Sequence, residues 1–145
     1  MSEPATPEWL EMLSTHECLD YLCNERLGRV GFTSRNRPVI LPVIYRVEDD
    51  AIWFLTEEGT KLSAAVANTY VAFEVDDLTE AGGWSVLVIG QSREEIDLSR
   101  IQAMREAGLV AGAPGRRDHL ITIPIQQISG RRFTTEARST ITGYL

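Results

Sequence analysis

The segment TEEGTKL, residues 56–62, combines the residue types that bind a phosphate group. It follows an apolar run, residues 51–55, that reads as a strand, and Thr60 stands where an N-cap residue would open an amphipathic helix extending to Asn68. The unpaired N–H groups and the dipole of a helix N-terminus attract an anion, and Lys61 adds a positive charge beside them. We therefore predict a phosphate site at Thr60 and Lys61. A plain N-cap beside a solvated lysine is the alternative, because the segment lacks the glycine density of a P-loop.

A proline interrupts the second of two apolar runs that precede this segment. Residues 29–33 and 38–45 read as strands joined by a polar turn, and residues 48–50 mark the turn to the next strand of an antiparallel meander. Because proline cannot donate to a sheet ladder, Pro42 belongs at an edge or a bulge. We expect the sheet to open there and to leave main-chain groups of Val43, Ile44 and Tyr45 free. An ordinary structural edge is the alternative.

The elements around these segments follow from periodicity and capping. Ser14 and Glu17 form a capping-box pattern that begins an amphipathic helix ending near Gly28, and Asp97 opens a second helix that stops at Gly108. Cys18 and Cys23 lie in the first of these helices, and we interpret both as buried structural thiols. Further strands are expected at residues 70–75, 119–124 and 125–133, with a polar loop at 76–83 and a loose arm at 1–13.

Residues 84–94 read as a strand that is apolar on both faces. Such a strand is covered on both sides, by a helix or by a second subunit. Trp84 and Ser85 stand at its start and offer an aromatic ring and a hydroxyl to a ligand. A tryptophan at the start of a strand can equally fill the core.

Composition limits the class of protein. The chain has 145 residues and a formal net charge of −7 without a basic block, which fits one domain and makes nucleic acid an unlikely partner. No apolar run approaches the length of a membrane span, and the acidic, proline-broken start does not fit a targeting peptide, so we expect a cytoplasmic protein. His16 and His119 are too far apart in sequence to complete a metal site.

The order of these elements resembles a known family. Over residues 13–133 the chain resembles the FMN-binding split β-barrel proteins of the pyridoxamine 5′-phosphate oxidase-like superfamily. The order that carries the resemblance is a helix, a strand hairpin, a further strand, the T-x-x-G-x-K helix, a strand, the W-S-V-x-V-x-G strand, a helix and two strands. The resemblance implies a mainly β (α+β) fold, an antiparallel split β-barrel of about six to seven strands with flanking helices. We place this domain at residues 14–133, between an arm (1–13) and a tail (134–145).

The resemblance also implies a homodimer with FMN sites at its interface, each built from both subunits. It places the flavin ring against Pro42, Val43, Ile44 and Tyr45, and the flavin phosphate beside Thr56, Thr60, Lys61 and Leu62. The partner subunit would supply Trp84 and Ser85, and Arg131 would lie near the phosphate or the dimer seam.

The resulting hypothesis is an FMN-dependent oxidoreductase that exchanges a hydride between flavin N5 and a small, partly planar organic substrate. The chemistry would belong to the cofactor, and the sequence shows no evident acid–base pair, so no catalytic residue is assigned. The arginine and histidine pattern with which the oxidase itself grips pyridoxal phosphate is not visible near the C-terminus. The alternatives are a deazaflavin-dependent reductase, a haem-binding protein of the same fold, or a flavin-binding dimer without catalysis.

Overall fold

The computed structural model describes residues 7–57, 69–109 and 118–134. Two helices lie in these ranges, α1 (Thr15–Asn24) and α3 (Leu98–Glu106). The strands of the described ranges are β1 (Leu10–Met12), β2 (Leu27–Ser34), β3 (Arg37–Glu48), β4 (Ala51–Glu57), β5 (Tyr70–Thr79), β6 (Gly82–Gln91), β7 (Arg93–Glu95), β8 (Asp118–Pro124) and β9 (Gln127–Thr134). None of the helices in these ranges is long and apolar enough to cross a membrane.

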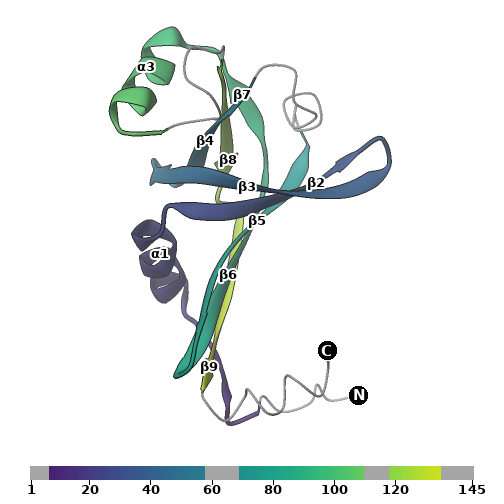
Figure 1. The fold of residues 1–145 in the computed structure, drawn as a ribbon, viewed down its shortest axis with the longest axis vertical. Helices are drawn as coiled ribbons and strands as arrows, with labels where there is room; N and C mark the ends of the chain where they lie inside the picture. Colours follow the sequence, from purple (N-terminus) through teal and green to yellow (C-terminus); the bar gives the residue numbers. More distant parts are fainter. Residues whose placement is uncertain (1–6, 58–68, 110–117, 135–145) are drawn as a thin grey trace.

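All strand pairs are antiparallel, and the strands of the described ranges follow the order β1-β9-β6-β5-β2-β3-β4-β8-β7. The long strand β3 joins the two parts of the sheet, because it pairs with β2 up to Ile44 and with β4 from Tyr45 onward. In Figure 1 the β2–β3 hairpin crosses the middle of the molecule, with β6 and β9 below it and α3 above. The predicted split β-barrel with flanking helices is confirmed; β1 and β7, of three residues each, raise the strand count above six or seven.

Two tight turns build the meander that the sequence predicts. Arg35 and Asn36, then Asp49 and Asp50, have positive φ angles of 51°, 62°, 54° and 54°. Positive φ at both central residues is the conformation of type I′ turns, which match the twist of the strands they join. The predicted loop at residues 76–83 is wrong, since β5 and β6 pair along their full lengths up to Thr79 and Gly82. Pairing with a neighbouring strand outweighs the polar composition there.

Helix α1 confirms the capping box, with hydrogen bonds of 3.0 Å and 3.2 Å between Ser14 and Glu17. The helix ends at Asn24, earlier than predicted, because β2 already begins at Leu27. Cys18 is buried and burial raises the pKa of its thiol, but Cys23 is exposed, so the prediction of two buried thiols is wrong for Cys23. Five positions rotate Cys23 by about 140° from Cys18 around the axis, which takes it off the buried face.

The core fills the inside of the barrel and a second layer outside it. The inner cluster gathers apolar side chains from α1 and from strands of both parts of the sheet, among them Leu22, Val30, Phe54, Phe73, Val88 and Ile121. The second cluster lies on the other face of β4, where Met104 of α3 and Leu109 pack on Trp53. Strand β1 extends the sheet by pairing with β9, so residues 10–12 are part of the fold instead of a loose arm.

Candidate functional site

Strands β3 and β4 separate where the sequence analysis places a ligand. Their ladder ends at the pair Tyr45 and Phe54. The same register continued would set Val43 opposite Thr56, but no pair forms there, and β3 pairs with β2 instead. We call this opening the fork: residues 42–45 lie on one side of it, and Thr56 lies on the other.

The main-chain groups of β3 alternate between the two edges of the strand. The Tyr45 N–H donates to the carbonyl of Arg26, at 2.9 Å, on the β2 side. Alternation therefore directs Val43 toward β2 as well, and Pro42 and Ile44 toward the fork. The expectation of free main-chain groups is wrong for Val43 and Tyr45, which face β2, whereas the Ile44 N–H does face the fork. The missing N–H of Pro42 also lies on this unpaired edge, so the proline removes no bond from the ladder with β2.

Thr56 brings a buried hydroxyl to the other side of the fork. The residue is 6% exposed, and its Oγ1 has no hydrogen-bond partner in the described part of the chain. A buried hydroxyl without a partner is costly, and in native proteins it commonly has a ligand or water as its partner. The Thr56 hydroxyl and the Ile44 N–H are donors and acceptors of the kind that a polar heterocycle such as a flavin ring requires. The remaining predicted phosphate residues, Thr60, Lys61 and Leu62, lie outside the described residues.

A histidine and a carboxylate meet next to Thr56. His119 on β8 is the register partner of Thr56, so both side chains lie on the same face of the sheet. The Nδ1 atom of His119 lies 2.7 Å from Oε1 of Glu94 on β7. A carboxylate at Nδ1 fixes the ring and keeps Nε2 available to a ligand or a proton. Sequence reasoning missed this pair, because only the β7–β8 register brings the two residues together.

The other predicted site residues fall on two faces of the lower sheet. Trp84 is half-buried on the inner face, and its ring stacks on Tyr21 of α1 with centroids 4.2 Å apart. Ser85 and Arg131 are cross-strand partners and share the outer face, where Arg131 is exposed. The structure thus brings Ser85 and Arg131 together and separates both from Trp84. Whether these residues complete a partner's site stays a prediction.

Arg132, next to Arg131 in sequence, is held by side chains of the fold. Its guanidinium donates to Glu11 at 2.8 Å, to Glu17 at 3.2 Å, and to the Tyr21 hydroxyl at 3.2 and 3.3 Å. The hydrogen bonds to Tyr21 and Glu11 are the main causes that raise the pKa of Arg132 above its ordinary value. This residue therefore joins α1 to β1 and β9, whereas the role of Arg131 near the phosphate or the dimer seam stays a prediction.

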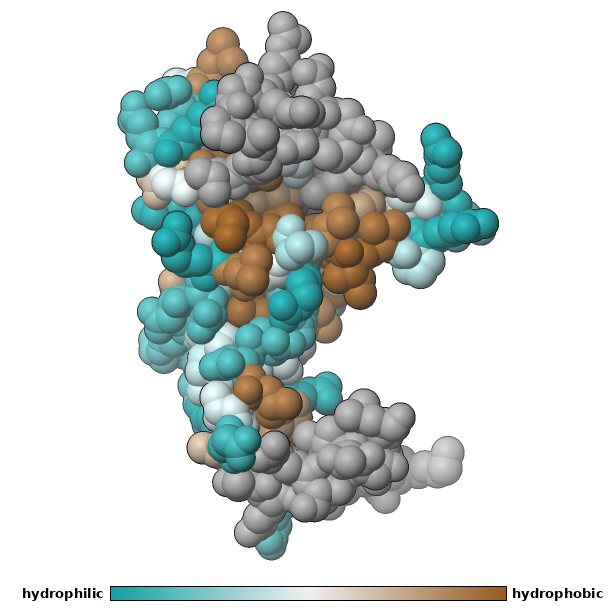
Figure 2. All heavy atoms as spheres, viewed as in Figure 1, coloured by the Kyte–Doolittle hydropathy of each residue, from teal (hydrophilic) through white to brown (hydrophobic). Residues whose placement is uncertain are grey.

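The outer face of the lower sheet exposes apolar side chains. Val86 and Val88 of β6 are buried, but Leu87 between them is 39% exposed, so the prediction of burial on both faces is not met within one chain. The register sets Ile40 and Ala72 on either side of Gly31, and a depression of about 340 Å³ opens among them, lined also by Tyr70 and Ile89. Figure 2 shows apolar side chains gathered along the β2–β3 hairpin up to its polar tip. In the described residues, no cluster of three or more His, Cys, Asp or Glu side chains could hold a metal ion.

Several solved structures share the fold of this chain. An FAD-binding protein from Mycobacterium smegmatis is 36% identical with a TM-score of 0.72, and the match covers 85% of this chain and 97% of that one. An FAD-binding protein from Mesorhizobium loti is 26% identical with a TM-score of 0.72, over 86% and 99% of the two chains. A protein from Mycobacterium smegmatis that binds FAD and haem is 17% identical with a TM-score of 0.67, over 88% and 74% of the two chains, and shows the fold alone.

Sequence comparison gives the family. An uncharacterised protein of Mycobacterium tuberculosis is 29% identical over 145 residues, which cover 95% of each chain. The family model of pyridoxamine 5′-phosphate oxidase matches residues 14–132, which contain both sides of the fork and every predicted site residue. The split barrel, the fork in it and this match agree, and the chain belongs to the pyridoxamine 5′-phosphate oxidase family.

Proposed function

We propose that this protein is a homodimeric, FMN-dependent oxidoreductase that acts on a small, partly planar organic molecule. The observation that carries the proposal is the fork, where Thr56, whose buried hydroxyl has no hydrogen-bond partner in the described residues, lies across from the edge of β3 that has left β4. Bound flavin would supply hydride exchange at its N5 atom.

The chain's own residues would bind and orient the cofactor. The Ile44 N–H and the Thr56 hydroxyl would hydrogen-bond the polar edge of the ring, and Lys61 with Thr60 would hold the phosphate. Burial of Thr56 and the apolar side chains of Val43 and Phe73 would limit access of water. Dry surroundings strengthen these hydrogen bonds because the local dielectric constant is low.

A second copy of the chain would cover the outer face. Leu27, Ile40 and Tyr70 are 52%, 70% and 65% exposed on one chain. An apolar surface of this kind marks an interaction site, and the same patch on two copies suits a two-fold interface. In that dimer Ser85 and Arg131, on the same face, would approach the partner's flavin site.

The cofactor could also be FAD. Two relatives described as FAD-binding proteins are 36% and 26% identical to this chain, which favours this second candidate. A deazaflavin coenzyme, haem, or a flavin without catalysis are the remaining alternatives. They share the fold and differ in the group held at the fork.

The experiment that tests the proposal is a visible absorption spectrum of the purified dimer, followed by chromatography of the cofactor that heat releases. A flavin spectrum with released FMN is the expected result, and reduction of a dye by NAD(P)H with the flavin still bound would show catalysis. Released FAD would support a flavin cofactor but identify it as FAD instead of FMN. A haem or deazaflavin spectrum, or no chromophore and no uptake of FMN, would overturn the proposal.

Thr56→Val and Lys61→Ala test the site itself. Replacing an unpartnered buried hydroxyl by a methyl group leaves folding stability unchanged or raises it, whereas loss of a ligand contact lowers affinity. We expect FMN affinity to fall by about fivefold or more in each variant, since each loses about 1 kcal/mol of hydrogen bonding or charge. Fluorescence titration measures this, and unchanged affinity in both variants would remove the fork from the flavin site.

Ile40→Glu tests the dimer. A charge at the centre of an apolar interface is desolvated without a partner, so the variant should sediment as a monomer and release flavin. Thr15→Glu, at an exposed position of α1 that does not line this depression, is the control for added charge alone. An Ile40→Glu variant that stays dimeric with tight flavin would contradict the shared site.

A further inference from the structure

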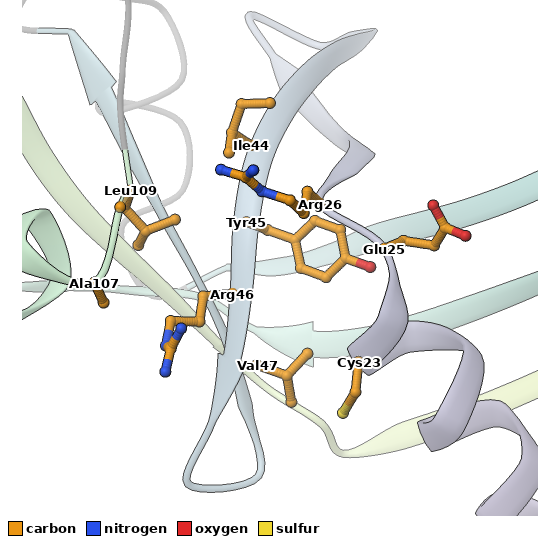
Figure 3. Close-up of a pocket in the computed structure, with 10 residues that line it drawn as sticks. Cys23, Glu25, Arg26, Ile44, Tyr45, Arg46, Val47, Ala107 and Leu109 are labelled. Atoms are coloured by element: carbon orange, nitrogen blue, oxygen red, sulfur yellow. The ribbon is translucent and has the colours of Figure 1, made fainter.

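A second cavity lies beside α1 and shares Ile44 and Tyr45 of β3 with the fork. It has a volume of about 480 Å³ and opens between the end of α1, the strand β3 and the segment that follows α3. Figure 3 shows the residues that surround it. Its lining is made by Cys23, Glu25, Arg26, Ile44, Tyr45, Arg46, Val47, Ala107, Gly108 and Leu109.

The cavity exists because β2 begins at Leu27, opposite Ile44, so the last part of β3 extends beyond the start of β2. The last pair between the two strands is Leu27 with Ile44, so β3 has no strand on that edge beyond Ile44. The Arg26 carbonyl accepts from the Tyr45 N–H and fixes the backbone at the start of the opening. By the same alternation, the main-chain groups of Val47 face the cavity, and no main-chain partner for them lies in the described ranges.

Two guanidinium groups border this opening. No side chain in the described part of the structure pairs with Arg26, which is exposed. Arg46 donates from Nε to Glu48 at 3.2 Å, which leaves its two terminal nitrogens available. In Figure 3 the Arg46 side chain extends to the side of β3 where Leu109 lies, the Arg26 guanidinium crosses in front of β3, and the carboxylate of Glu25 points the other way. The guanidinium of Arg26 and the terminal nitrogens of Arg46 are therefore the cationic donors that this cavity offers to an anion.

Apolar side chains complete the lining of the cavity. Leu109 is 4% exposed, and it packs with Ile44 in the cluster on the outside of β4. A cavity lined by arginines together with leucine and isoleucine matches a molecule that carries an anionic group on an apolar body. Arginine presents paired N–H donors that fit a carboxylate or a phosphate.

We propose that this cavity binds a small organic anion, a carboxylate or phosphate ester with an aromatic or aliphatic body, through Arg26 and Arg46. The site goes beyond the proposed flavin function, since it requires no flavin. Ile44 and Tyr45 border both sites, so the anion would lie against the strand that also carries the fork.

The test uses phenyl phosphate, inorganic phosphate and phenol, titrated by calorimetry into the full-length protein freed of any cofactor and again after loading with FMN. We expect saturable binding of phenyl phosphate, weaker binding of inorganic phosphate and none of phenol. Arg26→Gln and Arg46→Gln should each weaken phenyl phosphate binding by about tenfold, the effect of one charge-assisted contact. Arg37→Gln, at the opposite end of the same strand, is the matched control and should leave binding unchanged.

The outcomes separate this proposal from the flavin hypothesis. No binding of phenyl phosphate to the folded protein would overturn the anion site, and so would an equal loss in Arg37→Gln, which would indicate general charge attraction. If Lys61→Ala abolished phenyl phosphate binding while Arg26→Gln did not, the anion would belong to the predicted phosphate segment. A protein that binds phenyl phosphate through Arg26 and takes up no FMN would keep this site and reject the flavin.

Discussion

The two ends of α1 use arginine in opposite ways. At the N-terminal end, Arg132 contacts Glu11, Glu17 and Tyr21, and the Tyr21 ring lies between it and Trp84. At the C-terminal end, Arg26 borders an open cavity, and the described residues offer no carboxylate to its guanidinium. The first end is closed by charge and aromatic packing, and the second is open.

The difference shows that a guanidinium can serve either folding or ligand binding, depending on its partners. A guanidinium that is hydrogen-bonded to several side chains, as Arg132 is to Glu11, Glu17 and Tyr21, joins elements of the fold, and its loss should appear in stability. A guanidinium with unused donors beside a cavity contributes little to folding, because solvent already satisfies it, and its loss should appear in binding. Substitutions at the two ends of α1 test this difference.

The largest effect is expected for Trp84→Ala. The ring stacks on Tyr21 and packs against the inner core, so truncation should lower the free energy of unfolding by about 3 kcal/mol. Chemical denaturation measures the change, and Trp84→Phe should recover most of it. A variant of full stability that had lost its flavin would show instead that Trp84 serves the ligand, as the family resemblance implies.

Arg132→Gln should have an intermediate effect. The side chain is 35% exposed, so solvent screening reduces the value of its ion pairs, and we expect a loss of about 1 kcal/mol. Arg26→Gln should change stability by less than about 0.5 kcal/mol. Denaturation of the two variants side by side gives the comparison, and equal losses would remove the distinction between the closed and open ends.

The smallest effect is expected for Glu17→Gln, which keeps the capping hydrogen bonds and removes the charge. Hydrogen bonds from Ser14, followed by that from Arg132, lower the pKa of Glu17 below its ordinary value. A lowered pKa means that the carboxylate stabilises the fold at neutral pH and that this contribution disappears as the pH falls through the folded-state pKa. The variant should therefore be less stable than the native protein at pH 7 and equal to it in acid. A stability difference independent of pH would contradict this role.

Local signals in the sequence predicted much of the fold. The Ser14–Glu17 capping box, the two type I′ turns and the stop at Gly108 depend on residues a few positions apart, and each lies where it was predicted. The polar stretch after Val75 was predicted to be a loop, but it forms a strand because it pairs with β6, a neighbour that composition does not reveal.

The candidate site was predicted in part. Pro42 identified the strand that borders the fork, and Thr56 was named before its buried hydroxyl could be seen. Residue types could not show that Tyr45 faces β2, because the direction of a main-chain group depends on the register with a neighbour. The pair of His119 with Glu94 and the cavity beside Arg26 and Arg46 could not be predicted for the same reason, since both depend on strand register.

Sequence alone was enough to predict where the helices begin, the turns, the alternation of strands and, through their order, the family. These features depend on interactions between residues close in the chain, which composition and spacing record. The tertiary structure alone decided where β3 leaves β2 and joins β4, which side chains that exchange exposes, and which arginine has partners. Those outcomes depend on the pairing of segments distant in sequence, and the physical contacts that fix them exist only once the sheet has formed.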